Sequence, residues 1–342
     1  MSQEASYGLL LNMGGNLGDR AEDVMRITLH QATEAERLGL HDLWITEHHF
    51  IPFGINPSAV TTAGFLLGRT ERIRVGTAVA LAPLYHPVEL AEHAALLDQL
   101  SGGRFDLGIG RGGYLKDYEV LDVSIDRWTE EPLRSAAEIL GLWADPNVAR
   151  DTHTTGASVL QPTPRSEKPP LFIATRSADG IAFAAEHRLP LQHYFAVPVD
   201  ARVQLQEAYR DAAGAADDVG HLHTLIAVVD DDEEGTRALL AERLTELFAG
   251  GAWPHVPGAA DARGRTGGHH GPGTDRSAMA RGVADGAIVG PRDVVYDRIA
   301  EFREKTGARR MAFFVEAIGD ERRIQATLDA IGELARSEPA IS

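Results

Sequence analysis

The sequence predicts an α/β protein that folds as a single (β/α)8 TIM barrel over residues 1–342. The main observation is that short strand-like segments alternate with longer helix-like segments, and eight such pairs occur along the chain. Alternating βα units imply a parallel sheet, and eight of them imply a closed barrel. No internal repeat or linker divides the chain, which favours one domain. A doubly wound open sheet is the structural alternative, because it shows the same alternation.

The strand-like segments are short and rich in β-branched and aromatic residues. We expect strands at Tyr7–Asn12, Asp42–Thr46, Ile73–Val79, Arg104–Ile109, Leu171–Ala174, Leu191–Tyr194, Thr224–Val229 and Met311–Val315. The helix-like segments between them combine apolar residues at helical spacing with start and stop signals. We expect helices at Asp23–Leu38, Pro57–Arg69, Pro87–Leu100, Asp126–Trp143, Ala178–His187, Asp200–Ala213, Glu233–Phe248, Pro291–Lys305 and Asp320–Arg336.

One segment interrupts the alternation. Gly250–Gly286 is rich in Gly, Pro, His and Arg and has no apolar period. Such a stretch predicts a long mobile loop, inserted here before the last βα unit.

Composition excludes several classes of function. A formal charge of −17 argues against nucleic-acid and anionic-membrane partners, which need a positive face. The absence of cysteine removes disulfides, thiolate catalysis and cysteine-based metal sites. No signal-peptide pattern and no apolar run of about 18 residues occur, so we expect a soluble, cytoplasmic protein.

Polar and small residues gather where the predicted strands end, which is the active-site face of a (β/α)8 barrel. These residues are Asn12, Glu47, His48, His49, Ala78, Val79, Gly110, Arg111, Ser177, His193, Tyr194 and Glu316. His48 suits a general base, a hydrogen-bond donor to a cofactor, or a histidine that only stabilises a turn. No third ligand at metal-site spacing accompanies it, so we expect no metal. Successive side chains point to opposite sides, and we place His48 inward and His49 toward a neighbouring helix or subunit.

Two further positions suggest a bound phosphate. Gly108-Ile-Gly-Arg-Gly-Gly113 formally matches a dinucleotide fingerprint, but no helix follows it directly. Arg111 is better interpreted as a charge aimed at a phosphate, with a salt bridge as the alternative. Ser177 precedes a predicted helix and can bind a phosphate at its positive end, although capping alone is the commoner role.

At these residues the chain resembles the flavin-dependent luciferase-like monooxygenases, specifically the bacterial luciferase α-subunit group. The resemblance runs from about Tyr7 to Arg336. The matching signatures are Trp44-Ile-Thr-Glu-His-His-Phe50, Leu66-Leu-Gly-Arg-Thr70, Val75-Gly-Thr77, His86-Pro87, Leu96-Leu-Asp-Gln-Leu100, Gly103-Arg-Phe105, Arg111-Gly112, Tyr114 and Lys116-Asp117. The resemblance is dense up to Val123 and thin in Asp145–Pro170 and Gly250–Gly286.

The resemblance implies a barrel that binds reduced FMN at the carboxyl ends of its strands. His48, with Glu47 beside it, matches the catalytic position. The cofactor-binding positions implied are Ala78, Val79, Gly110, Arg111, Tyr114, Ser177 and Gly180. Ala78-Val79 falls where the family has a non-proline cis peptide under the flavin ring. Residues 250–286 match a flexible lid that would exclude water.

Three departures from luciferase limit what the resemblance implies. Gly110 replaces a reactive cysteine, which should leave more room near the flavin. Thr129 replaces a second phosphate-binding arginine, for which the nearby Arg127 is a substitute, and Gly180 replaces a phosphate-contacting threonine. Light emission and a long-chain aldehyde substrate are therefore not implied.

We accordingly expect an FMN-dependent monooxygenase. It would receive reduced FMN from a separate flavin reductase. The reduced FMN would react with O2 to form a flavin C(4a)-hydroperoxide, which would oxygenate a small organic substrate. A deazaflavin-dependent oxidoreductase and a non-catalytic flavin-binding subunit are the alternatives. Luciferase-like barrels commonly pair through the helices that follow the second and third strands, which here predicts a homodimer.

Overall fold

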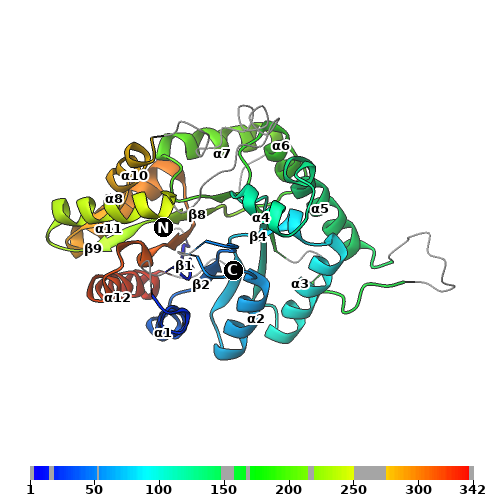
Figure 1. Ribbon diagram of the computed structural model, residues 1–342, viewed down its shortest axis with the longest axis horizontal. Coiled ribbons are helices and arrows are strands. Elements are labelled where there is room, and N and C mark those ends of the chain that lie inside the picture. Colours follow the sequence, from blue (N-terminus) through cyan, green and yellow to red (C-terminus); the bar gives the residue numbers. More distant parts are fainter. Residues whose placement is uncertain are drawn as a thin grey trace.

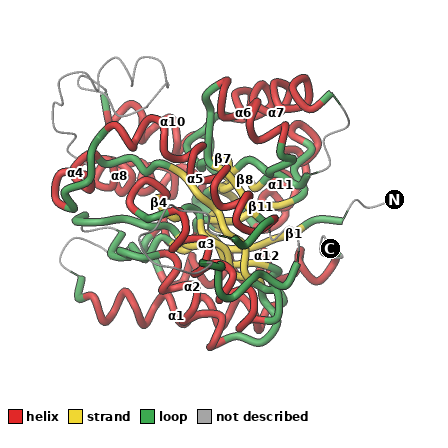
Figure 2. The backbone as a smooth tube through the Cα atoms, turned by 90° about the vertical axis from the view of Figure 1, so that its right-hand side faces the viewer, coloured by secondary structure: helices red, strands yellow, loops and turns green. Residues whose placement is uncertain are grey.

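Eight parallel strands form a ring with the helices outside it in the computed structural model (Figure 1). The structure describes residues 4–14, 19–51, 54–147, 158–166, 170–214, 219–249 and 275–338. Figure 2 shows the strands gathered at the centre of the molecule with helices around them. None of the helices in these ranges is long and apolar enough to cross a membrane.

The eight strands of the ring lie close to their predicted positions. They are β1 (Ser6–Leu11), β2 (Asp42–Ile45), β3 (Arg74–Thr77), β5 (Phe105–Gly110), β6 (Leu171–Ile173), β7 (Gln192–His193), β8 (Leu222–Leu225) and β11 (Arg310–Phe313). Pairing runs β6–β5–β3–β2–β1–β11–β8–β7, and every pair is parallel. A bridge between Ile173 and Leu191 closes the ring, with the Ile173 N–H donating to Pro190 O at 3.0 Å. The predicted (β/α)8 barrel is confirmed.

Nine long helices also follow the prediction within a few residues. They are α1 (Ala21–Leu38), α2 (Ala59–Arg69), α3 (Pro87–Ser101), α5 (Asp126–Ala144), α6 (Ala178–Glu186), α7 (Val199–Ala213), α8 (Glu233–Ala249), α11 (Arg292–Thr306) and α12 (Glu321–Ser337). Capping side chains and glycines determine where some of these helices begin and end. Ser58 Oγ accepts from the Thr61 N–H at the start of α2, and Gly39 ends α1 with a left-handed φ of 87°.

Smaller elements were not predicted. The expected strand Thr224–Val229 is two strands, because β9 (Ala227–Val229) leaves the ring and pairs with β10 (Ile288–Gly290). Two further helices are α4 (Leu115–Val120) and α10 (Arg276–Asp285). The remaining new elements are β4 (Ala80–Leu81), η1 (Ala82–Leu84) and η2 (Val315–Ile318).

The loop prediction for Gly250–Gly286 is wrong at its carboxyl-terminal end. Residues 276–285 form α10, which Asp275 caps by accepting from the Ala278 N–H. Ala280 and Ala284, four residues apart, are buried on one side of this helix. The Gly- and Arg-rich surroundings concealed that period. Residues 250–274 lie outside the described residues, so the lid stays a prediction.

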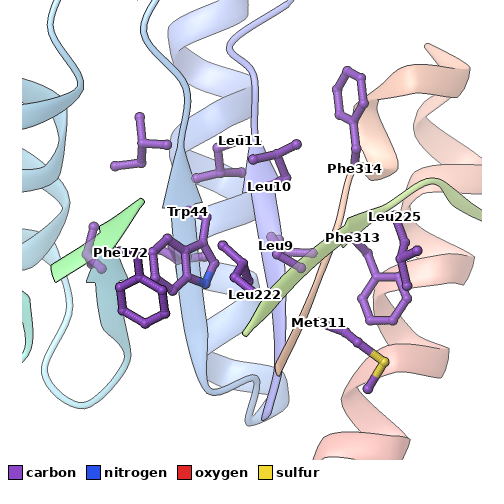
Figure 3. Close-up of a cluster of buried hydrophobic side chains, with 14 of the residues drawn as sticks. Leu9, Leu10, Leu11, Trp44, Phe172, Leu222, Leu225, Met311, Phe313 and Phe314 are labelled. Atoms are coloured by element: carbon purple, nitrogen blue, oxygen red, sulfur yellow. The ribbon is translucent and has the colours of Figure 1, made fainter. Parts of the chain in front are cut away.

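Large side chains fill the inside of the ring because glycines stand opposite them. Trp44 meets Phe172 edge-on, with ring centroids 4.9 Å apart, as Figure 3 shows. A Cβ on Gly76 would lie 2.5 Å from the Trp44 ring, and a Cβ on Gly108 would lie 2.3 Å from the Gln192 amide nitrogen. Neither strand position therefore tolerates a side chain, and both strands pack closely against the centre of the barrel.

Below this layer, charged side chains close the amino-terminal end of the barrel. Arg310 Nη1 lies 3.7 Å from Asp42 Oδ2 and 3.6 Å from Asp106 Oδ2. Arg74 Nε donates to Asp106 at 3.0 Å. Two buried carboxylates thus face two guanidiniums, a balance that lowers the cost of burying each charge.

A second buried polar cluster lies outside the ring, between the strands β7 and β8 and the helix α7. The rings of His193 and His223 lie with their centroids 4.6 Å apart and their planes tilted by 32°. Burial, together with the charge of Arg202, lowers the pKa of both imidazoles well below the ordinary value. Both rings are therefore neutral in the folded protein at neutral pH, whereas in the unfolded chain they take up protons below about pH 6.5.

These two buried histidines predict that the folded protein becomes less stable at acidic pH. Because their pKa values are depressed in the folded state, the stability they support is complete above about pH 6.5 and is lost as pH falls below it. We expect each to reduce the free energy of unfolding by up to about 1.4 kcal/mol per pH unit. Urea unfolding at about pH 7.5 and about pH 5.5 measures the loss. Between these pH values the free energy of unfolding of His223→Phe should fall less than that of the unaltered protein. The free energy of unfolding of His30→Gln, a change at an exposed histidine, should fall as much as that of the unaltered protein. Equal losses in all three proteins would contradict a role for the buried histidines.

Candidate active site

A cavity of about 180 Å³ opens at the carboxyl ends of the barrel strands. Its wall is largely apolar, with a few polar side chains directed into it, which is the usual make-up of a ligand site. The lining residues are Leu10, Asn12, Thr46, Glu47, His48, Ala78, Val79, Leu81, Gly112, Gly113, Tyr114, Ala174, Gln192, His193, Tyr194, Phe195, Thr224 and Leu247.

The structure divides the predicted site residues into two groups. Glu47, His48, Ala78, Val79 and Tyr114 all line this cavity. The other predicted positions are Gly110, Arg111, Ser177 and Gly180, which are not among its lining residues.

His48 is half-buried at the end of β2, with its ring edge-on to Tyr114 and centroids 5.7 Å apart. Its backbone N–H donates to Asn56 O at 2.9 Å, which fixes the turn after the strand. A Cβ on Gly54 would lie 2.6 Å from the ring, so the chain packs closely on the imidazole. Burial, with His49 adding to it, lowers the pKa of His48 to about 4. His48 is therefore a neutral imidazole near pH 7, suited to accepting a proton or a hydrogen bond.

His49 is not among the residues that line the cavity. Its Nε2 lies 3.9 Å from Glu47 Oε1. The Glu47 carboxylate raises the pKa of His49, and Asp117 on α4 adds to the effect. Asp117 is itself buried with neither carboxyl oxygen hydrogen-bonded in the described part of the chain, and burial raises its pKa to about 7.

The Glu47 carboxylate is occupied by hydrogen bonds. One oxygen accepts from the Ala59 N–H at 2.8 Å and from the Tyr85 hydroxyl at 2.7 Å. The other accepts from the Leu81 N–H at 3.1 Å. These donors belong to the start of α2, to β4 and to the residue after η1, so the carboxylate joins three segments around the cavity. This geometry favours a positioning role for Glu47 over the catalytic role predicted from the sequence.

The predicted cis peptide between Ala78 and Val79 is present. The Ala78 N–H donates to Ile45 O at 2.7 Å, which holds this peptide against the end of β2. The extra room expected at Gly110 is absent, because a Cβ there would lie 2.8 Å from Val79 Cγ2 and 3.3 Å from Ala174 Cβ. Val79 fills the space that the missing side chain leaves.

Arg111 lies just after β5, beside a second arginine that the sequence analysis did not single out. Its guanidinium carbon is 4.3 Å from the centroid of the Trp128 ring. Burial, with the charge of Arg176 adding to it, lowers the pKa of Arg111, and burial lowers the pKa of Arg176. Arg111 is half-buried and Arg176 is exposed, and the two cations are close enough to repel each other. An anion between them would be stabilising. The only sequence signal for Arg176 was its position directly before Ser177.

Ser177 is the cap of α6. Its Oγ accepts from the Gly180 N–H at 3.2 Å and lies 3.3 Å from Thr175 Oγ1. A Cβ on Gly180 would lie 2.1 Å from Thr175 Oγ1, so this position is restricted to glycine by close packing. The capping role is thus observed. The positive end of α6 follows directly on Arg176, and a helix start beside guanidiniums suits a phosphate.

Gln192 is a further site residue that strand prediction did not reveal. Its Nε2 donates across the barrel to Thr77 O at 3.0 Å. Its Oε1 is buried and has no hydrogen-bond partner among the described residues, although the residue lines the cavity. A flat heterocycle with N–H groups would satisfy this acceptor while its faces pack on Val79 and Leu81. The cavity and the neighbouring arginines therefore fit a ring system that carries a phosphate.

The hydrogen bonds of Glu47 give a test of its positioning role. Glu47→Gln replaces one accepting oxygen by an NH2 group that faces N–H or O–H donors. We expect the free energy of unfolding to fall by about 1.5–3 kcal/mol, the usual loss for a hydrogen bond to a charged group. Urea unfolding at neutral pH measures the change. Exposed Glu89→Gln, in the first turn of α3, is the matched control and should cost less than about 1 kcal/mol; equal effects would refute the positioning role.

Comparison with known proteins agrees with this geometry. Residues 8–310 match the sequence model of the luciferase-like monooxygenase family. The alkanal monooxygenase alpha chain of Photobacterium leiognathi is 31% identical over 227 residues, which cover 64% of this chain and 63% of that protein. The oxygenase component of the flavin-dependent trigonelline monooxygenase of Acinetobacter baylyi is 33% identical over 162 residues, which cover 46% of this chain and 45% of that protein. The chain thus spans less than two thirds of these relatives.

Solved structures share the fold over nearly their whole length. The monooxygenase RslO1 from Streptomyces bottropensis superposes with a TM-score of 0.78 at 22% identity, covering 96% of this chain and 98% of that one. The oxygenating constituent of 3,6-diketocamphane monooxygenase of Pseudomonas putida, in complex with FMN, superposes with a TM-score of 0.75 at 18% identity. The superposition covers 99% of this chain and 100% of that one. An F420-dependent secondary alcohol dehydrogenase superposes with a TM-score of 0.72 at 17% identity, covering 97% of this chain and 98% of that one.

At these identities the structural likeness shows the fold alone, and the sequence match decides the family. The match of residues 8–310 covers well over half of the 342 residues. The chain therefore belongs to the luciferase-like monooxygenase family.

Proposed function

We propose that this protein is the oxygenase of a two-component flavin-dependent monooxygenase. It would take reduced FMN from a separate reductase and use O2 to oxygenate a small organic molecule. The observation that carries the proposal is the pairing of an apolar slot containing the neutral His48 with a cationic end formed by Arg111, Arg176 and the start of α6. FMN has the complementary shape, since a flat ring system ends in a phosphate that carries nearly two charges at neutral pH.

When bound, reduced FMN supplies the chemistry. With O2 it would allow one oxygen atom to pass to the substrate and the other to leave as water, at the expense of the two electrons of the reduced flavin. The protein's own residues would hold the ring, exclude water and position a proton acceptor. Above about pH 5 His48 is mostly neutral, so it would accept a proton from the substrate or a hydrogen bond from the cofactor.

A deazaflavin-dependent hydride transfer is the second candidate. Its support is the structural likeness to an F420-dependent dehydrogenase, which concerns the fold. FMN is favoured because the two relatives above are named as monooxygenases and are more similar in sequence, at 31% and 33% identity.

Reaction with oxygen tests the proposal. The anaerobic complex of protein and reduced FMN is mixed with oxygenated buffer, and the flavin spectrum is followed by stopped flow. We expect an intermediate that outlives the reoxidation of free FMN; reoxidation at the free rate would contradict a monooxygenase. His48→Ala should bind reduced FMN within about twofold of the unaltered protein and slow oxygen transfer by about 100-fold, the low end of general-base effects. Undiminished oxygen transfer in that variant would remove His48 from the mechanism.

We also propose that two copies pair through α2 and α3. These helices lie next to each other on the outside of the barrel (Figure 1). Three of their large apolar side chains are exposed: Phe65 by 55%, Leu96 by 44% and Leu100 by 75%. Apolar side chains grouped on one face mark an interaction surface.

Light scattering at micromolar concentration tests this pairing. We expect a mass near twice the chain's 36.9 kDa. Leu100→Lys should shift the protein toward the monomer, because a desolvated ammonium opposes association. Leu121→Lys changes an exposed leucine away from these helices and should leave the mass unchanged. A monomeric unaltered protein would exclude the dimer.

A further inference from the structure

A second cavity, of about 380 Å³, lies beside the candidate active site. This volume is within the range of about 300–1,000 Å³ that is typical of small-molecule sites. Phe195 lines both cavities and forms the wall between them. The other lining residues come from the start of α7, the end of β8, β10 and the helices α10 and α11: Ala196, Val197, Pro198, Val199, Arg202, Leu225, Ile226, Met279, Gly282, Val283, Gly286, Ala287, Ile288 and Phe302.

Among the described residues, Arg202 is the only charged one in this wall. Its side chain is buried, with the residue 1% exposed. Nε donates to Val197 O at 2.8 Å, and Nη2 donates to the carbonyls of Tyr194, at 3.0 Å, and Thr224, at 2.9 Å. Nη1 is buried without a hydrogen-bond partner in the described part of the chain.

The charge of Arg202 is also uncompensated. No Asp or Glu among the described residues forms an ion pair with it, unlike Arg310, which faces two carboxylates. Its titratable neighbours are His193 and His223, whose buried His193 Nε2 and His223 Nδ1 have no hydrogen-bond partner in the same part of the chain. A buried cation among neutral groups is costly unless an anion pairs with it.

We propose that this second cavity binds a small molecule with an apolar body and a single carboxylate, and that Arg202 is the partner of the carboxylate. The apolar wall would bury the body of the ligand, and Nη1 would donate to a carboxylate oxygen. A neutral ligand would leave the guanidinium unpaired. A phosphate dianion would bring more charge than the single free NH2 group of the guanidinium and two neutral imidazoles can satisfy.

This inference does not depend on the flavin chemistry, because Phe195 is the only described residue that lines both cavities. A ligand in the second cavity would press on that side chain from the side opposite the candidate active site. The site is therefore placed to serve either as an extension for an acidic substrate or product or as a separate binding site.

Calorimetric titration of the flavin-free protein with octanoate and with 1-octanol tests the proposal. The two probes share an apolar chain and differ in the carboxylate. We expect saturable binding of octanoate with a dissociation constant about ten- to a hundredfold lower than that of octanol, the effect of one charge-assisted hydrogen bond. Equal binding of the two probes, or no saturable binding of octanoate, would overturn the proposal.

Gly282 supplies a matched pair of variants that locates the binding. It stands at the exposed rim of the cavity on α10, and a Cβ added there meets no atom within 4 Å. Gly282→Phe should block the cavity and abolish octanoate binding, whereas Gly282→Ala should retain it. Unchanged binding by Gly282→Phe would place the probe elsewhere and overturn the assignment.

Arg202→Met removes the charge itself. This variant should bind octanoate and octanol equally, because the apolar wall remains while the carboxylate loses its partner. A retained preference for octanoate would overturn the role of Arg202. Circular dichroism checks folding; if Arg202→Met does not fold, the two probes and the two Gly282 variants still decide the proposal.

Discussion

The candidate active site depends on one buried carboxylate. Glu47 accepts hydrogen bonds from the start of α2, from β4 and from Tyr85, at distances between 2.7 and 3.1 Å. It stands directly before His48, so the same turn that carries the imidazole is joined to the segment that follows the cis peptide of Ala78 and Val79. The two walls of the cavity are thereby fixed relative to each other. A buried charge with several donors is a strong constraint, because moving any one segment leaves part of the carboxylate unsatisfied.

Charge is distributed unevenly in this acidic protein. The chain has a formal charge of −17, yet Arg111 and Arg176 lie together beside the candidate active site, and Arg202 is buried beside the second cavity. At the other end of the barrel, Arg310 and Arg74 instead lie against the carboxylates of Asp42 and Asp106. We propose anionic ligands for the cations at the carboxyl ends of the strands, whereas Arg310 and Arg74 at the amino ends take part in buried ion pairs of the fold.

Local patterns predicted most of the fold. The strand before Glu47 and the helix that Ser58 caps follow from residues adjacent in sequence, and their positions are confirmed. The division of Thr224–Val229 into two strands depends on pairing with β10, which lies some sixty residues away, and α10 was concealed by its glycine-rich surroundings. The site was predicted at His48 and Val79 because strand ends converge in a barrel, and at Tyr114 because of the resemblance to a known family. The partners of Glu47, the neighbour of Arg111 and the space filled by Val79 at Gly110 are tertiary contacts, which no single segment encodes.

We propose that Arg111, Arg176 and the start of α6 bind the phosphate of a flavin whose ring occupies the cavity beside His48. The most direct measurement compares the dissociation constants of reduced FMN and reduced riboflavin under anaerobic conditions. The account predicts that FMN binds about ten- to a hundredfold more tightly, that Arg111→Ala removes most of this difference without weakening riboflavin, and that exposed Arg134→Ala has no effect. Equal affinities of the unaltered protein for the two flavins would contradict it.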